Sequence, residues 1–199
     1  MKEMKVRITF LEEVLGTANA DKDVHSEFIA SKAPDAPSRE EEVASLGVDE
    51  VEKKEMTVFP RLEDGTPFLW NYQIKGFFKS AAQAMSYVGG DNKLTAYKKK
   101  IDLLVFIDER KIPLILPKGG EIGSCQRPLR AQTMQGERVA LANSETCPEG
   151  TTAEFTIRIL DDSLAKHVIR WLDYGKYNGM LQWRSSGKGA FEWTDITDK

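Results

Sequence analysis

Hydrophobic and polar residues alternate over residues 4–10, close to the start of the chain. Met4, Val6, Ile8 and Phe10 fall on one side of this pattern, and charged residues and a threonine fall on the other. A period of two residues is typical of a strand with one buried face. The same alternation returns over residues 153–159 after a Pro-Glu-Gly turn. We therefore expect two half-buried strands, one near each end of the chain.

Apolar residues at three- and four-residue intervals predict a helix over Tyr72–Met85, which the Gly89-Gly90 pair ends. A second helix is expected after Asp161-Asp162-Ser163, because its apolar residues share one face and the acidic and serine residues suit a helix start. A short helix is expected around Ser38–Leu46, where acidic residues follow Ser38.

The remaining patterns predict strands. Leu103–Ile107 and Ile112–Leu116 are expected to flank a charged turn, residues 126–143 are interpreted as an extended hairpin, and Phe191 with Trp193 marks the final strand. The order strand, helix, strand, strand, then strand, helix, strand suggests two ferredoxin-like halves of an α+β fold.

The 199 residues suffice for one domain with a proper core, and hydrophobic and charged shares of 41% and 30% are ordinary for a globular protein. Residues 18–66 are polar and irregular, and we interpret them as an insertion. We expect a cytoplasmic protein without membrane contact, since neither a membrane-spanning run nor a signal-peptide pattern is present. Cys125 and Cys147 fit a reduced compartment, as free thiols or a disulfide pair.

A net charge of −3 argues against a general polyanion binder. The charge is uneven, however: residues 40–55 are strongly acidic, while 97–100 and 126–138 are basic. The segment 179–191 combines three glycines with an arginine, two serines and a lysine, a set that suits a phosphate oxygen. The alternative is a glycine-containing hairpin that closes the last strand.

Two further interpretations are weighed from the residues alone. Lys75 and Lys79 are four apart beside the apolar stripe of their helix, where they either bind phosphates or are only solvated. Trp183 either stacks on a base or packs in the core, and core packing is the expectation. The sequence has no P-loop, dinucleotide-binding fingerprint or serine-hydrolase elbow.

Several segments, in this order, resemble RAMP-superfamily proteins, the RNA-binding subunits of CRISPR effector complexes. Val6–Phe10 with Val14-Leu-Gly16 looks like their first strand and glycine turn. The run from Thr66 to Lys79 resembles the start of their helix with its Lys-Gly pair, although Trp70-Asn71 departs from the family pattern. Ser144–Phe155 and the loop around Arg184-Ser-Ser-Gly187 are similar to later family elements, although Leu181 replaces a glycine. The likeness is greatest to type III backbone subunits and covers most of the chain.

The resemblance implies a ferredoxin-like, RRM-like RAMP fold over residues 1–199, with an antiparallel sheet, helices on one face, the insertion at 18–66, a thumb-like hairpin at 126–143 and the glycine-rich loop at 179–191. It implies binding of single-stranded RNA or a nucleotide and a role in antiviral defence. Its partners would be copies of itself or CRISPR effector subunits. The nucleic-acid-binding candidates are Lys75, Lys79, Arg127, Arg130, Arg138, Arg184, Ser185, Ser186, Gly187, Lys188 and Gly189. The bases would stack on Trp183 or Tyr72, and Met134 would be the apolar tip of the thumb.

Catalysis is the weaker expectation. Type III backbone subunits cleave RNA with an aspartate in the loop after the first strand and a divalent metal, and Asp21, Asp23 and His25 lie in a comparable loop. We expect no resident cofactor or metal unless the protein is such a nuclease, in which case Mg²⁺ is required. Two alternatives to a guide-RNA-binding subunit stay open: a metal-dependent endoribonuclease, and a solitary, phage-encoded protein that inhibits a CRISPR complex or sequesters a nucleotide.

Overall fold

The computed structural model describes residues 1–19, 56–133 and 136–197. The chain divides into two compact units, each of which is described by itself. The first comprises Met1–Val14, Pro60–Glu121 and Cys147–Lys199, and the second comprises Leu15–Phe59 and Ile122–Thr146. The predicted helix at Ser38–Leu46 and most of the segment 18–66 lie outside the described residues.

The first unit is built on a four-stranded antiparallel sheet. Its strands are β1 (Lys2–Phe10), β6 (Val105–Ile107), β10 (Thr152–Ile159) and β11 (Phe191–Asp195), in the spatial order β11-β1-β10-β6. Along the chain the order is β1, helix, β6, β10, helix, β11. This is one complete ferredoxin-like arrangement, so the two halves expected from the sequence are the two strand–helix–strand units of a single sheet.

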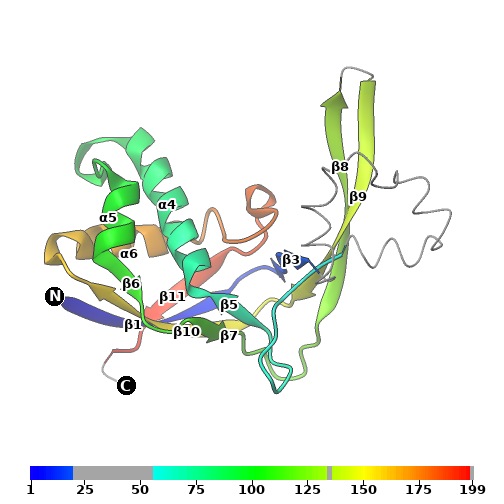
Figure 1. Cartoon of the computed structure of the whole chain (residues 1–199), viewed down its shortest axis with the longest axis horizontal. Coiled ribbons are helices and arrows are strands. Elements are labelled where there is room, and N and C mark those ends of the chain that lie inside the picture. Colours follow the sequence, from blue (N-terminus) through cyan, green and yellow to red (C-terminus); the bar gives the residue numbers. More distant parts are fainter. Residues whose placement is uncertain (20–55, 134–135, 198–199) are drawn as a thin grey trace, which may run out of the picture. The chain divides into compact units, whose positions relative to one another are not determined.

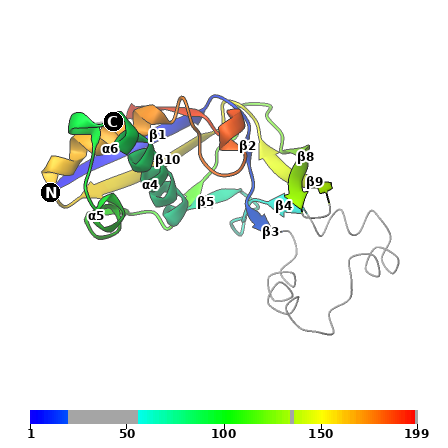
Figure 2. The ribbon, with the colours of Figure 1, turned by 90° about the horizontal axis from the view of Figure 1, so that it is seen from above.

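The described α-helices of this unit cover one face of the sheet (Figure 1). They are α4 (Asn71–Val88), α5 (Tyr97–Leu104) and α6 (Ala165–Tyr174), and α4 lies between the other two when the sheet is seen from above (Figure 2). Short 3-10 turns span Gly90–Asn92, Asp162–Leu164 and Arg184–Ser186. None of the helices in the described ranges is both long enough and apolar enough to cross a membrane.

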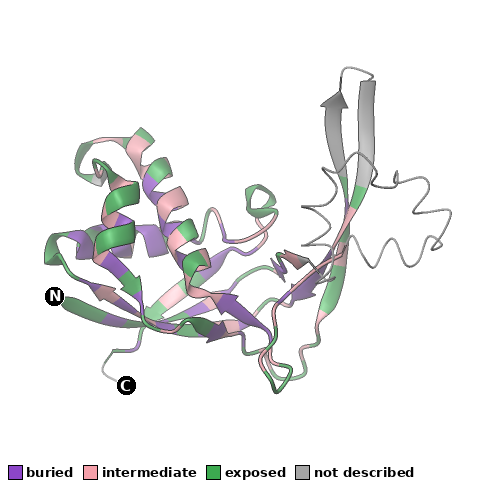
Figure 3. Ribbon diagram, in the orientation of Figure 1, coloured by how far each residue is buried: buried purple, intermediate pink, exposed green. Residues whose placement is uncertain are grey.

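The core forms where the apolar face of the sheet packs against the apolar faces of the helices. Figure 3 shows the buried residues along this interface. Met4, Val6 and Ile8 are almost fully buried, as the alternation predicts. An aromatic contact joins α4 to the sheet, because Phe77 lies edge-on to Phe191 of β11 with centroids 5.0 Å apart. A second joins α4 to α6, because Phe78 contacts Trp171 at 5.7 Å between centroids. Burial of such rings contributes about 1.5–3 kcal/mol each.

The predicted strand Leu103–Ile107 is wrong in its first half, because residues 103 and 104 end the helix α5. The Val105 amide donates to the Ile101 carbonyl, so the helical hydrogen-bonding pattern continues through these residues, and the fully buried Ile101 anchors this last turn in the core. The flanking strands also belong to different sheets. β6 pairs with β10, whereas β7 (Lys111–Pro113) pairs with β5 (Phe68–Trp70).

The second unit contains a long antiparallel hairpin of β8 (Gly123–Thr133) and β9 (Gly136–Cys147). β9 continues into a sheet with β2 (Val14–Leu15), β4 (Met56–Val58) and β3 (Ala18–Asn19), and β4 runs parallel to β9. Cys125 and Cys147 are free thiols. The described residues of the segment 126–143 therefore pair as the strands of an extended hairpin, as the sequence indicates.

Candidate nucleic-acid interface

The glycine-rich loop is closed by backbone contacts at its base. The Met180 amide donates to the Gly189 carbonyl at 3.1 Å, and the Gly189 amide donates to Glu13 at 2.8 Å. Gly189 has φ +68°, and a Cβ on Gly179 would collide with the Gly189 backbone. Glycine is required at both positions, because other residues disfavour this backbone angle or leave no room for the close approach. The base of the loop therefore serves to lead the chain into β11.

The tip of the loop is different, because its polar side chains are exposed. Arg184, Ser185 and Ser186 form a short 3-10 turn with exposed side chains. The Gly187 amide donates to the Arg184 carbonyl at 3.0 Å, which closes this turn. Three successive residues of one turn thus expose a guanidinium and two hydroxyls, groups that can bind a phosphate.

Lys188 is directed toward the base instead. Its Nζ lies 3.3 Å from carboxylate oxygens of both Glu12 and Glu13. Burial lowers the pKa of Lys188, but the hydrogen bonds to Glu13 and Glu12 outweigh this effect and raise it. The charge of Lys188 is therefore compensated within the protein.

Trp183 precedes the tip and was expected in the core. That prediction is wrong: Trp183 has φ +56° and its side chain is 40% exposed. The turn that presents Arg184 also carries the Trp183 ring toward the surface.

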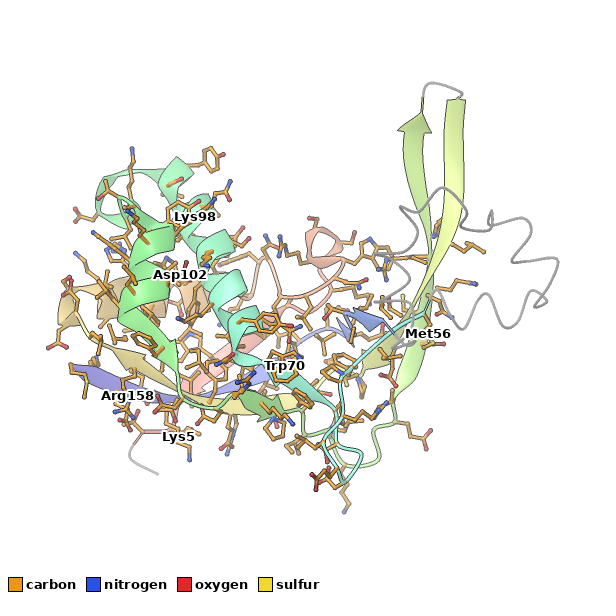
Figure 4. The ribbon with its side chains drawn as sticks, viewed as in Figure 1. Lys5, Met56, Trp70, Lys98, Asp102 and Arg158 are labelled. Carbon is orange, nitrogen blue, oxygen red and sulfur yellow. The ribbon has the colours of Figure 1, made fainter. Side chains whose placement is uncertain are left out.

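Lys75 and Lys79 both reach toward α5. The Lys79 ammonium lies 2.7 Å from an Asp102 carboxylate oxygen. The Lys75 ammonium donates to the Asp102 carbonyl at 3.2 Å and lies 4.7 Å from the centre of the Phe106 ring. Burial lowers the pKa of Lys75, Asp102 opposes this effect and Lys79 adds to it. Figure 4 labels Asp102 on α5, and both lysines contact this residue, Lys79 at the carboxylate and Lys75 at the carbonyl. These contacts join α4 to α5.

The exposed side of α4 carries Tyr72 and Gly76, one helical turn apart. Tyr72 is 63% exposed, and a Cβ added to Gly76 would meet nothing within 4 Å. Residues four apart share a helix face, so the surface beyond the tyrosine ring is bare backbone. No acidic residue occupies the first turn of α4.

A pocket of about 450 Å³ lies at the start of α4, lined by Trp70, Asn71, Tyr72 and Arg110. Trp70, labelled in Figure 4 where β5 meets α4, stacks with Tyr72 at an interplanar angle of 15° and a centroid distance of 6.3 Å. The Arg110 guanidinium lies 5.8 Å from the Trp70 ring centre. Sequence reasoning treated Trp70-Asn71 only as a departure from the family pattern and Arg110 only as part of a charged turn.

The open face of the sheet presents ion pairs. Arg7 contacts Glu154 at 2.6 Å, and Arg158 contacts Asp108 at 2.6 Å and Glu3 at 3.3 Å. Figure 4 shows Arg158 on the side of the sheet away from the helices. RRM domains stack bases on aromatic residues of this face. Here the acidic partners compensate both arginines. Exposed aromatic rings that could stack on a base also lie outside the sheet, at the start of α4 and in the glycine-rich loop.

In the hairpin, Arg127 is only 6% exposed and donates to the Ser144 hydroxyl at 3.1 Å. Arg130 pairs in register with Val139, and Arg138 pairs with Ala131 on the opposite strand. The side chains of Arg130 and Arg138 lie outside the described part, as do Met134, Asp21, Asp23 and His25. Across residues 1–19, 56–133 and 136–197, no cluster of three potential metal ligands is present.

Comparison with known proteins gives a match in structure alone. No protein-family model matches the chain, and no curated protein matches it in sequence. Its structure is similar to a chain in the cryo-EM structure of the type III-B Cmr-beta complex bound to cognate target RNA, with a TM-score of 0.52 and 12% identity over 97% of this chain. This likeness agrees with the α+β fold of ferredoxin-like type described above.

The chain spans 59% of the length of that Cmr-beta chain. A subunit of a type IV-B CRISPR complex matches with a TM-score of 0.47 and 10% identity, over 99% of this chain and 91% of the other.

Proposed function

We propose that this protein binds single-stranded RNA on its RAMP-type scaffold, as a guide-RNA-binding backbone subunit of a CRISPR effector complex does. The observation that carries the proposal is the bare helical surface at Gly76. A glycine within an exposed helix costs about 1 kcal/mol relative to alanine. The surroundings of Gly76 do not require it, because a Cβ there meets open space. A molecule from outside that must approach the helix backbone supplies a reason.

The chemistry around this surface favours RNA. Tyr72 offers an exposed ring one turn before Gly76, and Arg110 lies in the adjoining pocket. Phe191, which follows the glycine-rich loop, contacts Phe77 beside Gly76. The tip with Arg184 and its two serines belongs to the same compact unit as α4. Single-stranded RNA needs cations for its phosphates and flat groups for its bases.

The fold supports the proposal independently. The Cmr-beta complex that contains the similar chain is bound to target RNA. The charge of −3 on the whole chain is compatible with RNA binding, because the cations are concentrated at particular elements. We further propose that other copies of this chain, or CRISPR effector subunits, are its partners.

The test is a titration of the purified chain with labelled unstructured RNA, and with duplex DNA of equal length, at several salt concentrations. Gly76→Ala is the decisive variant. It should raise the free energy of unfolding by about 1 kcal/mol, because alanine is the better helix former, and yet weaken RNA binding. Gln83→Ala, at another exposed position of α4, is the matched control.

Two results would contradict the proposal. One is the absence of RNA binding by the wild-type chain even at low salt, where phosphate contacts are strongest. The other is a Gly76→Ala variant that is more stable and binds RNA as tightly as Gln83→Ala does. Stable association with a purified effector complex, without RNA affinity, would instead favour the inhibitor alternative.

A further inference from the structure

In the turn that joins β6 to β7, the acidic and the basic side chains point to different neighbours. It contains two acids followed by two bases, Asp108-Glu109-Arg110-Lys111. The Asp108 carboxylate binds Arg158, and the Glu109 carboxylate accepts hydrogen bonds from the Thr156 amide at 2.7 Å and hydroxyl at 2.9 Å. Both acids are therefore turned toward β10.

The two bases of the turn lie against aromatic rings instead. Arg110 is over Trp70, and the Lys111 ammonium is 5.9 Å from the Trp70 ring centre and 5.4 Å from that of Phe68. The pairing of β5 with β7 fixes this arrangement, because Trp70 and Lys111 are direct neighbours across the strands. The side of the turn that faces α4 thus carries positive charge over a row of aromatic rings.

The pocket at the start of α4 opens beside this row. Its volume of about 450 Å³ is within the range of about 300–1,000 Å³ typical of ligand pockets. The lining combines an exposed phenol ring, an amide side chain and a guanidinium. A planar ring stacks on Tyr72, the Asn71 amide can both donate and accept hydrogen bonds, and Arg110 attracts an anion. These three properties together match a nucleobase with an attached phosphate.

We propose that this pocket binds one nucleobase, stacked on Tyr72, with the phosphate of the same nucleotide beside Arg110. The inference rests on the proposed function, since the nucleotide would belong to the bound RNA. A free nucleotide offers the same chemistry, and the experiment must distinguish the two sources. Base–aromatic stacking typically contributes about 1–3 kcal/mol, so loss of the Tyr72 ring should weaken binding about five-fold or more.

The test compares wild type, Tyr72→Phe and Tyr72→Ala as full chains. Each is titrated with an unstructured RNA and with an abasic analogue of the same length and backbone charge. We expect the wild type and Tyr72→Phe to bind the RNA alike and to prefer it to the analogue. Tyr72→Ala should bind the RNA about five-fold or more weakly and lose much of that preference. Because Tyr72 is largely exposed, equal melting temperatures should verify that all three chains are folded.

Equal RNA affinity of all three variants would overturn the pocket while leaving RNA binding in place. If the wild type binds neither polymer, the proposed function fails, and titration with adenosine and uridine monophosphates then decides the pocket. Saturable mononucleotide binding that Tyr72→Ala abolishes and Tyr72→Phe retains would support a nucleobase site for free nucleotides. Absence of mononucleotide binding would overturn the proposed nucleobase pocket.

Discussion

Lys188 and Glu13 are joined at the base of the glycine-rich loop, where the lysine Nζ lies 3.3 Å from a carboxylate oxygen of Glu13. The amide of the next residue, Gly189, donates to the Glu13 carbonyl at 2.8 Å. Two successive residues thus hold the loop to the segment that follows β1. The charge of Lys188 serves this attachment, which leaves Arg184 as the cation that the tip of the loop presents.

Arg184→Ala should therefore weaken RNA binding more than Lys188→Ala does. Loss of one phosphate contact on single-stranded RNA lowers the slope of log affinity against log salt by about 0.7. We expect that change for Arg184→Ala and little change in slope for Lys188→Ala. The latter should cost less than about 1 kcal/mol of folding stability, since partly exposed ion pairs are weak. Salt-dependent RNA titrations of both variants measure the difference, and a reversed order would contradict it.

Gly179→Ala should destabilise the protein. A Cβ at Gly179 would collide with the backbone of Gly189, and backbone cannot move aside as a flexible side chain can. Overpacking of this kind costs about 1–3 kcal/mol. Urea unfolding provides the measurement, and Gly76→Ala is the natural comparison because its effect on stability should have the opposite sign. Equal stability of Gly179→Ala and wild type would show that the loop base is not rigid.

His167 should make the protein sensitive to mild acid. Burial lowers the pKa of His167, with Lys166, Arg170 and Lys100 adding to the effect and Asp91 opposing it. The folded-state pKa is below the unfolded value, so the unfolded chain takes up a proton first as pH falls. The stabilisation is complete above about pH 6.5 and is lost at lower pH.

The measurement is the melting temperature between about pH 7.5 and pH 5.5. His167→Gln should show a smaller decrease over this range than wild type, because glutamine does not titrate. His25→Gln, which alters the other histidine of the chain, is the comparison that assigns the decrease to one of the two residues. If His25→Gln reduced the acid-induced decrease in melting temperature and His167→Gln did not, His167 would be excluded as its cause.

Two arginines of the hairpin, Arg127 and Arg138, should differ in whether their loss affects folding stability or RNA binding. Arg127 is buried against Ser144, so Arg127→Ala should cost about 1–3 kcal/mol, the usual price of an unsatisfied buried polar group. Arg138→Ala should weaken RNA binding with a smaller salt slope, as the thumb-like role implied by the resemblance requires. Chemical denaturation and RNA titration of both variants test this. RNA affinity lost equally with Arg127→Ala at unchanged stability would contradict it.

Local patterns in the sequence determined most of the scaffold. The alternation in residues 4–10 and 153–159 and the apolar stripe of Tyr72–Met85 correspond to β1, β10 and α4. Such elements follow from the chain itself, because side-chain direction repeats with a fixed period in strands and helices. The glycine-rich loop was also evident as a segment, although not which of its residues are free to meet a ligand.

Only the tertiary structure decided how the charged and aromatic side chains are used. Lys188 is compensated by a glutamate 175 positions away in sequence, and Thr156 binds Glu109 from 47 positions away. Whether a cation faces solvent or a carboxylate depends on such distant neighbours, and the local periodicity of the sequence carries no information about them. The same holds for residues 103 and 104, which end the helix α5 although their sequence pattern predicts a strand. Likewise, strand pairing places Lys111, 41 residues later in the chain, directly opposite Trp70. The residue before Lys111, Arg110, therefore lines the same pocket as Trp70.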